Sequence, residues 1–260
     1  MTTRVDSDRT IGAQTVVRAL GVLELLRETP RAMGVTDVAR ALSLNVSTAH
    51  RVLRALVSAG YVAQNPDTDR YRLGRQAYLL GLAAGRNLGL DDVTSILERL
   101  RDETGESANL VVRDNNEGLV VLRVESEQPL RFTQEAGTRI PLHCTSSGKV
   151  LLAFAQDFQQ GLAELELARM TPLTITSRAK LLRELKQIRV SGYSINRGER
   201  IPGVCGVATP ILDSSGIATA AVAMQGPAVR VTEDRYPALG ELMLDVAAEV
   251  QAALPAGYTI

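Results

Sequence analysis

The apolar and polar positions between Val35 and Leu73 divide that stretch into two helices and a hairpin. A short helix is predicted from about Thr36 to Leu42. A second helix is predicted to begin near Ser47, a residue type that caps helix amino termini. At about 100° per residue, its apolar residues share one side, and its other side carries Ser47, His50, Arg51, Arg54 and Ser58. Two extended runs follow, Tyr61–Gln64 and Arg70–Leu73, separated by the turn residues 65–69.

This order of elements predicts a winged helix-turn-helix. The polar face of the second helix suits the major groove of DNA, where arginine can pair with guanine and hydroxyls can hold phosphates. The residues expected to contact DNA are Ser47, Thr48, His50, Arg51, Arg54 and Arg70. The alternative is a small helical subdomain with a solvated charged face. The agreement of order, cap, helical wheel and hairpin disfavours that alternative.

Two further helices are expected on either side of this unit. Residues 15–28 carry an apolar stripe, formed by Val16, Leu20, Leu23 and Leu26, and Thr29-Pro30 ends that helix. Gly74 to about Leu88 is rich in alanine, glycine and leucine. We expect it to be a linker helix that also helps to pair two chains.

After Asp91 the pattern changes to short strands with helices at either end, which predicts an α+β domain with helices covering an antiparallel sheet. The expected helices are residues 91–103, 146–155, 177–190 and 233–254. The expected strands are residues 109–113, 119–125, 130–134, 192–196, 204–212 and 218–225. The predicted domains are therefore residues 10–74 and 91–260, joined by a linker helix over residues 75–90.

The distribution of charge supports this division, although the 29 basic and 29 acidic residues cancel overall. Residues 1–90 contain 12 arginines and 7 acidic residues, a net charge of +5, whereas residues 91–260 carry −5. A basic part joined to an acidic part fits a DNA-binding domain fused to one that does not touch DNA. The chain has two cysteines, no apolar run long enough to cross a membrane and a polar amino terminus, so we expect a cytoplasmic protein with no membrane partner.

Enzymatic interpretations find little support in the sequence. Ser147-Gly148-Lys149 shares residues with a P-loop, but His143 and Val150 stand where that motif needs glycine and a hydroxyl residue. His143 and Cys144 are adjacent, and although Cys205 could meet His143 in space, nothing would orient such a base. Two histidines and two cysteines are a poor metal-ligand set. We therefore expect no catalytic residues, no metal and no cofactor.

The better candidate for chemistry is the helix predicted to start around Thr145-Ser146-Ser147. The free N–H groups and the positive dipole end of a helix start attract an anion such as a carboxylate. The alternative is that Ser146 and Ser147 only cap the helix.

At this point the sequence resembles the IclR family of bacterial transcriptional regulators over about residues 14–253. In the first half the resemblance rests on residues 14–20, 48–53, 60–62 and 71–74. In the second half it rests on Pro141-Leu142-His143, Ser147-Gly148-Lys149, Gly192-Tyr193, Gly203-Val204, Pro210-Ile211 and Gly226-Pro227. The resemblance implies a GAF-like domain that binds a small metabolite, and dimers that often pair into tetramers on DNA.

The resemblance also implies which positions contact the effector. They are Leu130, Ile140, Ser146, Ser147, Asn196, Gly206, Ala223 and Gln225. Asn196 stands where the family often has an acidic residue, and Ala223 where it often has a small hydroxyl residue. Gly206 and Gln225 also differ from better-understood members, so the identity of the ligand does not carry over from a relative.

The sequence thus predicts a regulator whose binding to double-stranded operator DNA is modulated by a small organic acid. Its carboxylate is expected at Ser146 and Ser147, with apolar walls from Leu130 and Ile140 and polar contacts from Asn196 and Gln225. Two alternatives remain open. One is a constitutive DNA-binding regulator with a degenerate effector domain, and the other is an enzyme fused to a DNA-binding domain.

Overall fold

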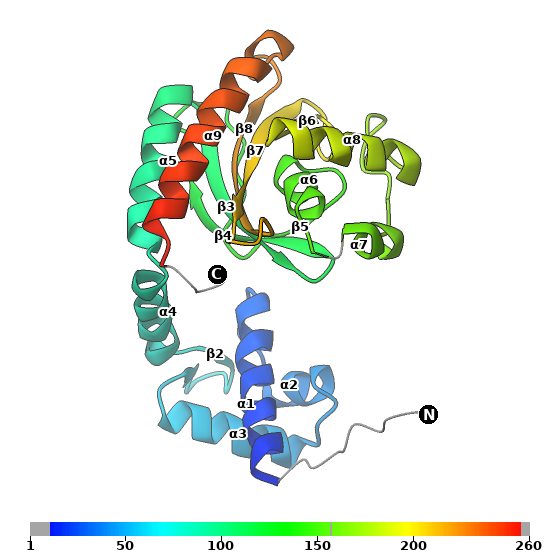
Figure 1. The fold of residues 1–260 in the computed structure, drawn as a ribbon. Helices are drawn as coiled ribbons and strands as arrows, with labels where there is room; N and C mark the ends of the chain where they lie inside the picture. Colours follow the sequence, from blue (N-terminus) through cyan, green and yellow to red (C-terminus); the bar gives the residue numbers. More distant parts are fainter. Residues whose placement is uncertain (1–10, 157, 256–260) are drawn as a thin grey trace. The chain divides into compact units, whose positions relative to one another are not determined.

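The structure is a computed structural model that describes residues 11–156 and 158–255 (Figure 1). The chain forms two compact units, and the division between them falls between Gly85 and Arg86, inside helix α4. None of the described helices combines the length and the apolar character that crossing a membrane requires.

The amino-terminal unit is a three-helix group followed by a hairpin and the start of a fourth helix. Its elements are α1 (Ile11–Glu28), α2 (Val35–Ala41), α3 (Val46–Ser58), β1 (Val62–Gln64), β2 (Tyr71–Leu73) and α4 (Arg75–Asn87). The strands β1 and β2 are antiparallel, with Ala63 opposite Arg72. Aliphatic side chains from all three helices pack with Val62 and Tyr71 of the hairpin, so the predicted winged helix-turn-helix is confirmed.

Two local predictions in this unit are wrong. Asn45, not Ser47, caps α3, because its side-chain oxygen accepts from the Thr48 backbone N–H at 2.8 Å. The Ser47 hydroxyl donates to that same oxygen, at 2.9 Å. The predicted stripe of α1 is wrong in its first half: Val16 and Leu20 are more than half exposed, and the helix contributes Val22 and Leu26 to the core instead.

Helix α4 has no buried residue. Four of its apolar side chains are 42–66% exposed, namely Tyr78, Leu79, Leu80 and Leu82. Val16, Val17 and Leu20 of α1 are exposed as well. Large apolar side chains gathered on exposed helices are typical of a surface that another chain covers.

The carboxyl-terminal unit is built on a six-stranded sheet with the order β5-β4-β3-β8-β7-β6, in which every pairing is antiparallel. Its strands are β3 (Ser107–Asp114), β4 (Glu117–Val124), β5 (Arg139–Pro141), β6 (Ser194–Arg197), β7 (Val204–Leu212) and β8 (Ala218–Pro227). Its helices are α5 (Leu90–Thr104), α6 (Ser146–Ala153), α7 (Phe158–Glu164), α8 (Arg178–Ser191), the 3-10 turn η1 (Glu233–Arg235) and α9 (Tyr236–Ala253).

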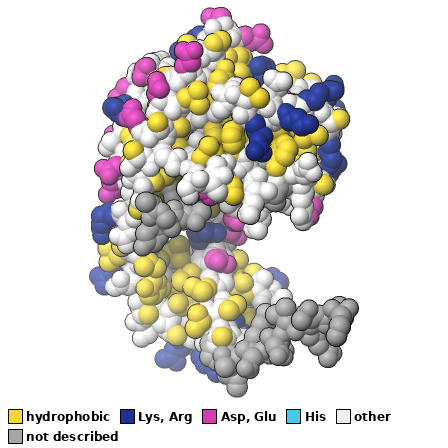
Figure 2. All heavy atoms as spheres, viewed as in Figure 1, with side chains coloured by type: hydrophobic (Ala, Val, Ile, Leu, Met, Phe, Trp, Pro, Cys, Tyr) yellow, Lys and Arg dark blue, Asp and Glu magenta, His cyan; other side chains and the backbone are white. Residues whose placement is uncertain are grey.

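Helices cover both faces of this sheet. The helices α5 and α9 lie side by side on one face, and α6, α7 and α8 lie on the other (Figure 1). Alternate residues along each strand enter the two cores: Leu110 and Val222 face α5 and α9, whereas Val111 and Ala221 face α6. The face that is visible in Figure 2 carries basic side chains over α8 and acidic ones over α5.

The strand predicted at residues 130–134 is wrong. That segment is a loop whose Phe132 carbonyl accepts a hydrogen bond from the Ser107 hydroxyl, at 2.7 Å, instead of joining a ladder. The edge strand next to β4 is the three-residue β5, which was not predicted, and α7 was not predicted either. The last helix was predicted to begin at Glu233, where the structure has η1 before α9.

Candidate DNA-binding surface and effector site

Helix α3 separates its two faces as the wheel predicted. Its apolar face is buried against α1, α2 and the hairpin, and Ser47, His50, Arg51 and Arg54 are exposed while Thr48 is half-buried. Within residues 11–156 and 158–255, neither Arg51 nor Arg54 has an ion pair, whereas Arg40 of α2 pairs with Asp37 at 3.8 Å. The two guanidinium groups of α3 are therefore available to a phosphate or a base edge.

The turn of the hairpin is held by its own side chains. The Asn65 side-chain oxygen accepts from the backbone N–H groups of Asp67, at 2.9 Å, and Thr68, at 3.0 Å. Arg70 is exposed, and one of its nitrogens donates to the carbonyl oxygen of Ala32 at 2.9 Å. This bond ties the base of the hairpin to the segment before α2, and the remaining guanidinium N–H groups can still reach a phosphate.

Ser146 and Ser147 do not cap α6, which was the alternative to a role in binding a ligand. Thr145 caps the helix, because its hydroxyl accepts from the Gly148 backbone N–H at 3.1 Å and donates to the Pro141 carbonyl at 2.8 Å. Ser146 and Ser147 are fully buried, and their hydroxyls have no hydrogen-bond partner among the residues that the structure describes. Since buried hydroxyls are almost always paired, these two are candidates for ligand contacts.

Glycine at position 148 makes this arrangement possible. A Cβ atom there would lie 2.4 Å from both the Cα atom and the carbonyl oxygen of Leu142. The chain before α6 therefore passes directly over the first turn of the helix, which keeps that turn away from water. A buried helix start holds an anion more strongly than an exposed one does, because screening by solvent is weaker there.

Four of the predicted effector residues lie on the strands beneath this helix start. Asn196, Gly206, Ala223 and Gln225 are buried, and Ile140 is buried in the core around α6. A Cβ atom on Gly206 would lie 3.3 Å from the Ser146 hydroxyl oxygen. Leu130 is 62% exposed on its loop, and its backbone carbonyl accepts from Arg230 at 2.7 Å. The structure thus places six of the eight predicted positions near one another, whereas Ile140 lies opposite Gly118 on the edge strand β5 and Leu130 on an exposed loop.

Sequence reasoning missed three polar residues near this site. Asn109 of β3 and Gln134 of the loop after β4 are buried, and the Nδ2 and Nε2 atoms of their amides lack partners among the described residues. Arg200 donates to the Gln134 side-chain oxygen at 2.7 Å. A buried amide in the otherwise apolar run of β3 was a signal for Asn109. We call the buried polar residues beneath and in the first turn of α6 the polar cluster: Asn109, Ser146, Ser147, Asn196 and Gln225.

Lys149 of α6 is fully buried, and the sequence did not predict its structural role. Its ammonium group donates to Glu184 at 2.5 Å, to Glu199 at 2.7 Å and to the Ile195 carbonyl at 2.6 Å. The Glu199 backbone N–H in turn donates to the Asn196 side-chain oxygen at 2.8 Å. One buried cation therefore holds the segment that orients Asn196 of the polar cluster.

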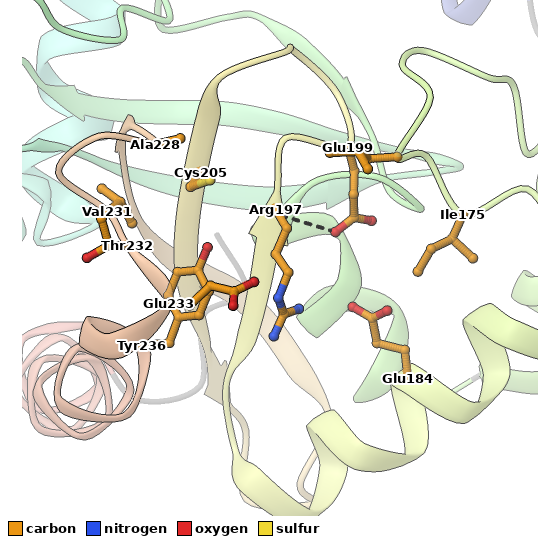
Figure 3. Close-up of a pocket in the computed structure, with 11 residues that line it drawn as sticks. Ile175, Glu184, Arg197, Glu199, Cys205, Ala228, Val231, Thr232, Glu233 and Tyr236 are labelled. Atoms are coloured by element: carbon orange, nitrogen blue, oxygen red, sulfur yellow. Dashed lines mark hydrogen bonds between the residues drawn. The ribbon is translucent and has the colours of Figure 1, made fainter.

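A cavity of about 570 Å³ lies outside the predicted effector residues, between α8, the end of β6 and η1 (Figure 3). Three of its four charged side chains have partners: the Arg197 guanidinium lies 5.3 Å from the centre of the Tyr236 ring, and Glu184 and Glu199 share Lys149. The fourth, Glu233, is an acid and would disfavour a carboxylate there. None of the eight predicted effector positions lines it. The unpaired groups of the polar cluster make that cluster the better effector site.

Cys144, His143 and Cys205 do not form a catalytic group in the structure. Burial, and next the Glu199 carboxylate, raise the pKa of Cys144 to about 11, so its thiol is protonated at neutral pH. The Nε2 atom of His143 lies 2.9 Å from the Ala168 carbonyl oxygen. Cys205 belongs to the core on the α5 and α9 face of the sheet, away from His143. In the described part of the chain, no group of three His, Cys, Asp or Glu residues could hold a metal ion.

Comparison with known proteins identifies this arrangement. Residues 90–252 match the family described as bacterial transcriptional regulator IclR C-terminal, and residues 15–66 match the IclR helix-turn-helix domain. Among curated relatives, the HTH-type transcriptional regulator BhcR of Paracoccus denitrificans is 34% identical over 92% of this chain and 86% of that protein. The HTH-type transcriptional repressor AllR of Escherichia coli is 30% identical over 94% of this chain and 91% of that protein.

Solved structures agree with these matches. The IclR protein of Thermotoga maritima is 30% identical, with a TM-score of 0.71 over 94% of this chain and 99% of that one. An IclR homologue from Microbacterium hydrocarbonoxydans, crystallised with 4-hydroxybenzoate, is 27% identical, with a TM-score of 0.80 over 92% of this chain and 98% of that one. The chain therefore belongs to the IclR family and is a DNA-binding transcriptional regulator with an effector-binding domain.

Proposed function

We propose that a small organic acid binds at the start of α6 and modulates how tightly this regulator holds its operator. The observation that carries the proposal is the pair of buried, unpaired hydroxyls on Ser146 and Ser147 in the first turn of that helix. The first turn also offers free backbone N–H groups and a positive dipole end, which together favour a carboxylate. The Microbacterium relative crystallised with 4-hydroxybenzoate, which is a carboxylic acid, supports this choice of chemistry.

We assign operator contacts to α3 and to the hairpin. Arg51 and Arg54 supply unpaired guanidinium groups, and Ser47 and Thr48 supply hydroxyls at the start of the helix. Because phosphate contacts release bound cations, operator affinity should fall steeply as salt rises. Binding that does not depend on salt, in a fluorescence anisotropy titration with the DNA around its own gene, would argue against this surface.

We further propose that the protein acts as a homodimer, which can pair into a tetramer, and that it is not an enzyme. The exposed apolar residues of α1 and α4 support pairing with a second copy of the chain. The raised pKa of Cys144 and the bond between His143 and Ala168 support the absence of an activated nucleophile. A dimer also suits operators with two half-sites.

The effector proposal is tested by thermal shift and calorimetry with a panel of small organic acids. A ligand that binds only the native state raises the melting temperature, so at least one acid should do so and should change operator affinity. Ser147→Trp should fill the site and abolish binding, and the milder Ser147→Ala should weaken it. Ser95→Trp on the exposed surface of α5 is the matched control and should bind normally.

Two results would decide between the alternatives. If an acid binds the wild type and Ser147→Trp equally well, the site lies elsewhere. If no acid in the panel shifts the melting temperature or the operator affinity, the effector domain is degenerate and the regulator is constitutive.

A further inference from the structure

Two neighbouring rows of residues cross the sheet beneath α6. Directly paired residues on antiparallel strands point to the same face, so the register places Ser107, Gln225, Gly206 and Asn196 in one row. Two residues along, Asn109, Ala223, Ala208 and Ser194 form the next row on that face. The middle of the second row is small, with Ala223 and Ala208, and the first row has Gln225 and Gly206 at its middle; both rows have polar ends. The small residues Gly206, Ala208 and Ala223 are the part of this face where a ligand can approach the sheet most closely, with polar side chains around it.

The start of α6 is fixed over these rows. The Ser194 hydroxyl donates to the Ser146 carbonyl at 2.5 Å, and Gly206 lies beneath the Ser146 hydroxyl. Two loops approach from opposite sides. The loop after β4 is held at Ser107 through the Phe132 carbonyl, and the loop after β6 is held at Asn196 through the Glu199 N–H. The bond between Gln134 and Arg200 joins the two loops.

The orientation of two amides in this arrangement is decided by their partners. Arginine only donates hydrogen bonds, so the Gln134 atom that meets Arg200 must be its oxygen, and Nε2 is left as an unpaired, buried donor. A backbone N–H also only donates, so the Asn196 atom that meets Glu199 is its oxygen as well. Both amides therefore have their acceptor occupied and their N–H groups available.

Arg200 is a half-buried cation that forms no ion pair with a described residue. The side chain is partly removed from water, and this burial lowers the pKa of the guanidinium group from its usual value. In the described ranges, no carboxylate forms an ion pair with it, and its bond to Gln134 is to a neutral amide. Arginine stays charged in proteins, so a half-buried guanidinium without a carboxylate partner would gain from an anion beside it.

Among the buried side-chain atoms that lack a partner in the described residues, Glu199 Oε2 is the one that can only accept. Its carboxylate is already matched, because Oε1 accepts from Lys149 at 2.7 Å and the charge is shared between both oxygens. The other buried side-chain atoms without a partner in the described part of the chain belong to amide N–H groups or serine hydroxyls. The site thus offers two positive poles, the start of α6 and Arg200, with N–H donors around them.

We propose that the effector of this regulator is a dicarboxylate. One carboxylate accepts from Ser146, Ser147 and the first backbone N–H groups of α6, and the other accepts from Arg200 and the Nε2 group of Gln134. The N–H groups of Asn109 and Asn196 donate to oxygens between the two ends. This proposal rests on the proposed function, since it names the class of acid that the site takes.

Calorimetry on the full-length protein tests it with three matched series of the same carbon numbers. The first contains succinate, glutarate and adipate. The second contains butyrate, pentanoate and hexanoate, which lack the second carboxylate. The third contains 4-aminobutyrate, 5-aminopentanoate and 6-aminohexanoate, which replace it with a cation. At least one diacid should bind about tenfold or more tightly than its monoacid, because bonds to charged groups are worth that much, and its amino analogue should bind no better than the monoacid.

Variants locate the second carboxylate. Arg200→Gln should weaken binding of the best diacid about tenfold or more while leaving its monoacid unchanged. Arg197→Gln is the matched control, since Arg197 lies over the Tyr236 ring on the opposite face of the sheet, and it should bind the diacid normally. Operator affinity without ligand, measured for each variant, shows that the fold is intact.

The outcomes separate the two proposals. If monoacids bind the wild type as tightly as diacids, or if Arg200→Gln weakens both to the same extent, the dicarboxylate is excluded and the organic-acid site remains. If no compound of any series binds or changes operator affinity, the organic-acid site itself is overturned, and the dicarboxylate with it.

Discussion

At the scale of single residues, Lys149 places a positive charge inside the carboxyl-terminal unit. Its ammonium group is matched by Glu184, Glu199 and one backbone carbonyl. Removing one partner from a buried charge network leaves the remaining charges uncompensated, which is far more costly than the network is favourable. Lys149 therefore links α6 to α8 in addition to the apolar contacts between the two helices.

We expect Lys149→Met to lower the free energy of unfolding by about 3–5 kcal/mol, because two carboxylates would then face each other without a cation. Urea denaturation followed by circular dichroism measures the change. Lys186→Met, at an exposed position of α8, is the control and should change it by less than about 0.5 kcal/mol. Adding Glu199→Gln to Lys149→Met should restore part of the loss, and an absence of any restoration would argue against the charge explanation.

Arg51 and Arg54 carry the second prediction at this scale. Arg51→Ala or Arg54→Ala should weaken operator binding by about 1–3 kcal/mol if the arginine contacts a base edge. Both side chains are exposed, so the melting temperature should stay unchanged. Arg40→Ala in α2, whose side chain pairs with Asp37, serves as the comparison in an anisotropy titration. Unchanged operator affinity in both α3 variants would show that another surface contacts the DNA.

The roles of residues that depend on a local sequence pattern could be predicted. The roles that depend on tertiary packing could not. The exposed face of α3 follows from the helical repeat alone. At the start of α6, three consecutive hydroxyl residues offer the same capping chemistry, and the tertiary contact between the Thr145 hydroxyl and the Pro141 carbonyl favours Thr145. Gln134 and Arg200 meet through loops that are distant in sequence, so no local pattern could have paired them.

At the scale of elements, α6 depends on a glycine. Gly148→Ala places a Cβ atom 2.4 Å from the backbone of Leu142 and 2.6 Å from the Thr145 hydroxyl, so the helix start must move. We expect a loss of stability of about 1–3 kcal/mol and a loss of effector binding, measured by urea denaturation and calorimetry. Gly21→Ala in α1 makes ordinary contacts and should be neutral or stabilising by up to about 1 kcal/mol. Normal effector binding by Gly148→Ala would place the ligand away from α6.

The sequence predicted long, periodic elements well and short ones poorly. The expected strand at residues 130–134 contains apolar residues, but its backbone bonds to the Ser107 side chain rather than to a neighbouring strand. The true edge strand, β5, has three residues, which is too short to show an alternating pattern. Its place beside β4 comes from tertiary pairing, with Ile140 opposite Gly118.

At the scale of the whole molecule, the exposed apolar residues of α4 predict a dimer. Leu80→Glu would bring an unpaired charge into the interface, so the dimer dissociation constant should rise about a hundredfold or more. Analytical ultracentrifugation measures it. Val190→Glu, at an exposed apolar position of α8, is the control and should leave the dimer intact. A Leu80→Glu protein that remains fully dimeric would move the interface away from α4.

The segment around Glu199 has a consequence for motion within the carboxyl-terminal unit. The Glu199 carbonyl accepts from the hydroxyls of Thr171, at 3.2 Å, and Thr174, at 2.6 Å, while its N–H reaches Asn196. A ligand that immobilises Asn196 should therefore slow amide hydrogen exchange at residues 171–174, which are distant in sequence from every predicted effector position. The turn at residues 171–174 would then report occupancy of the site without touching the ligand.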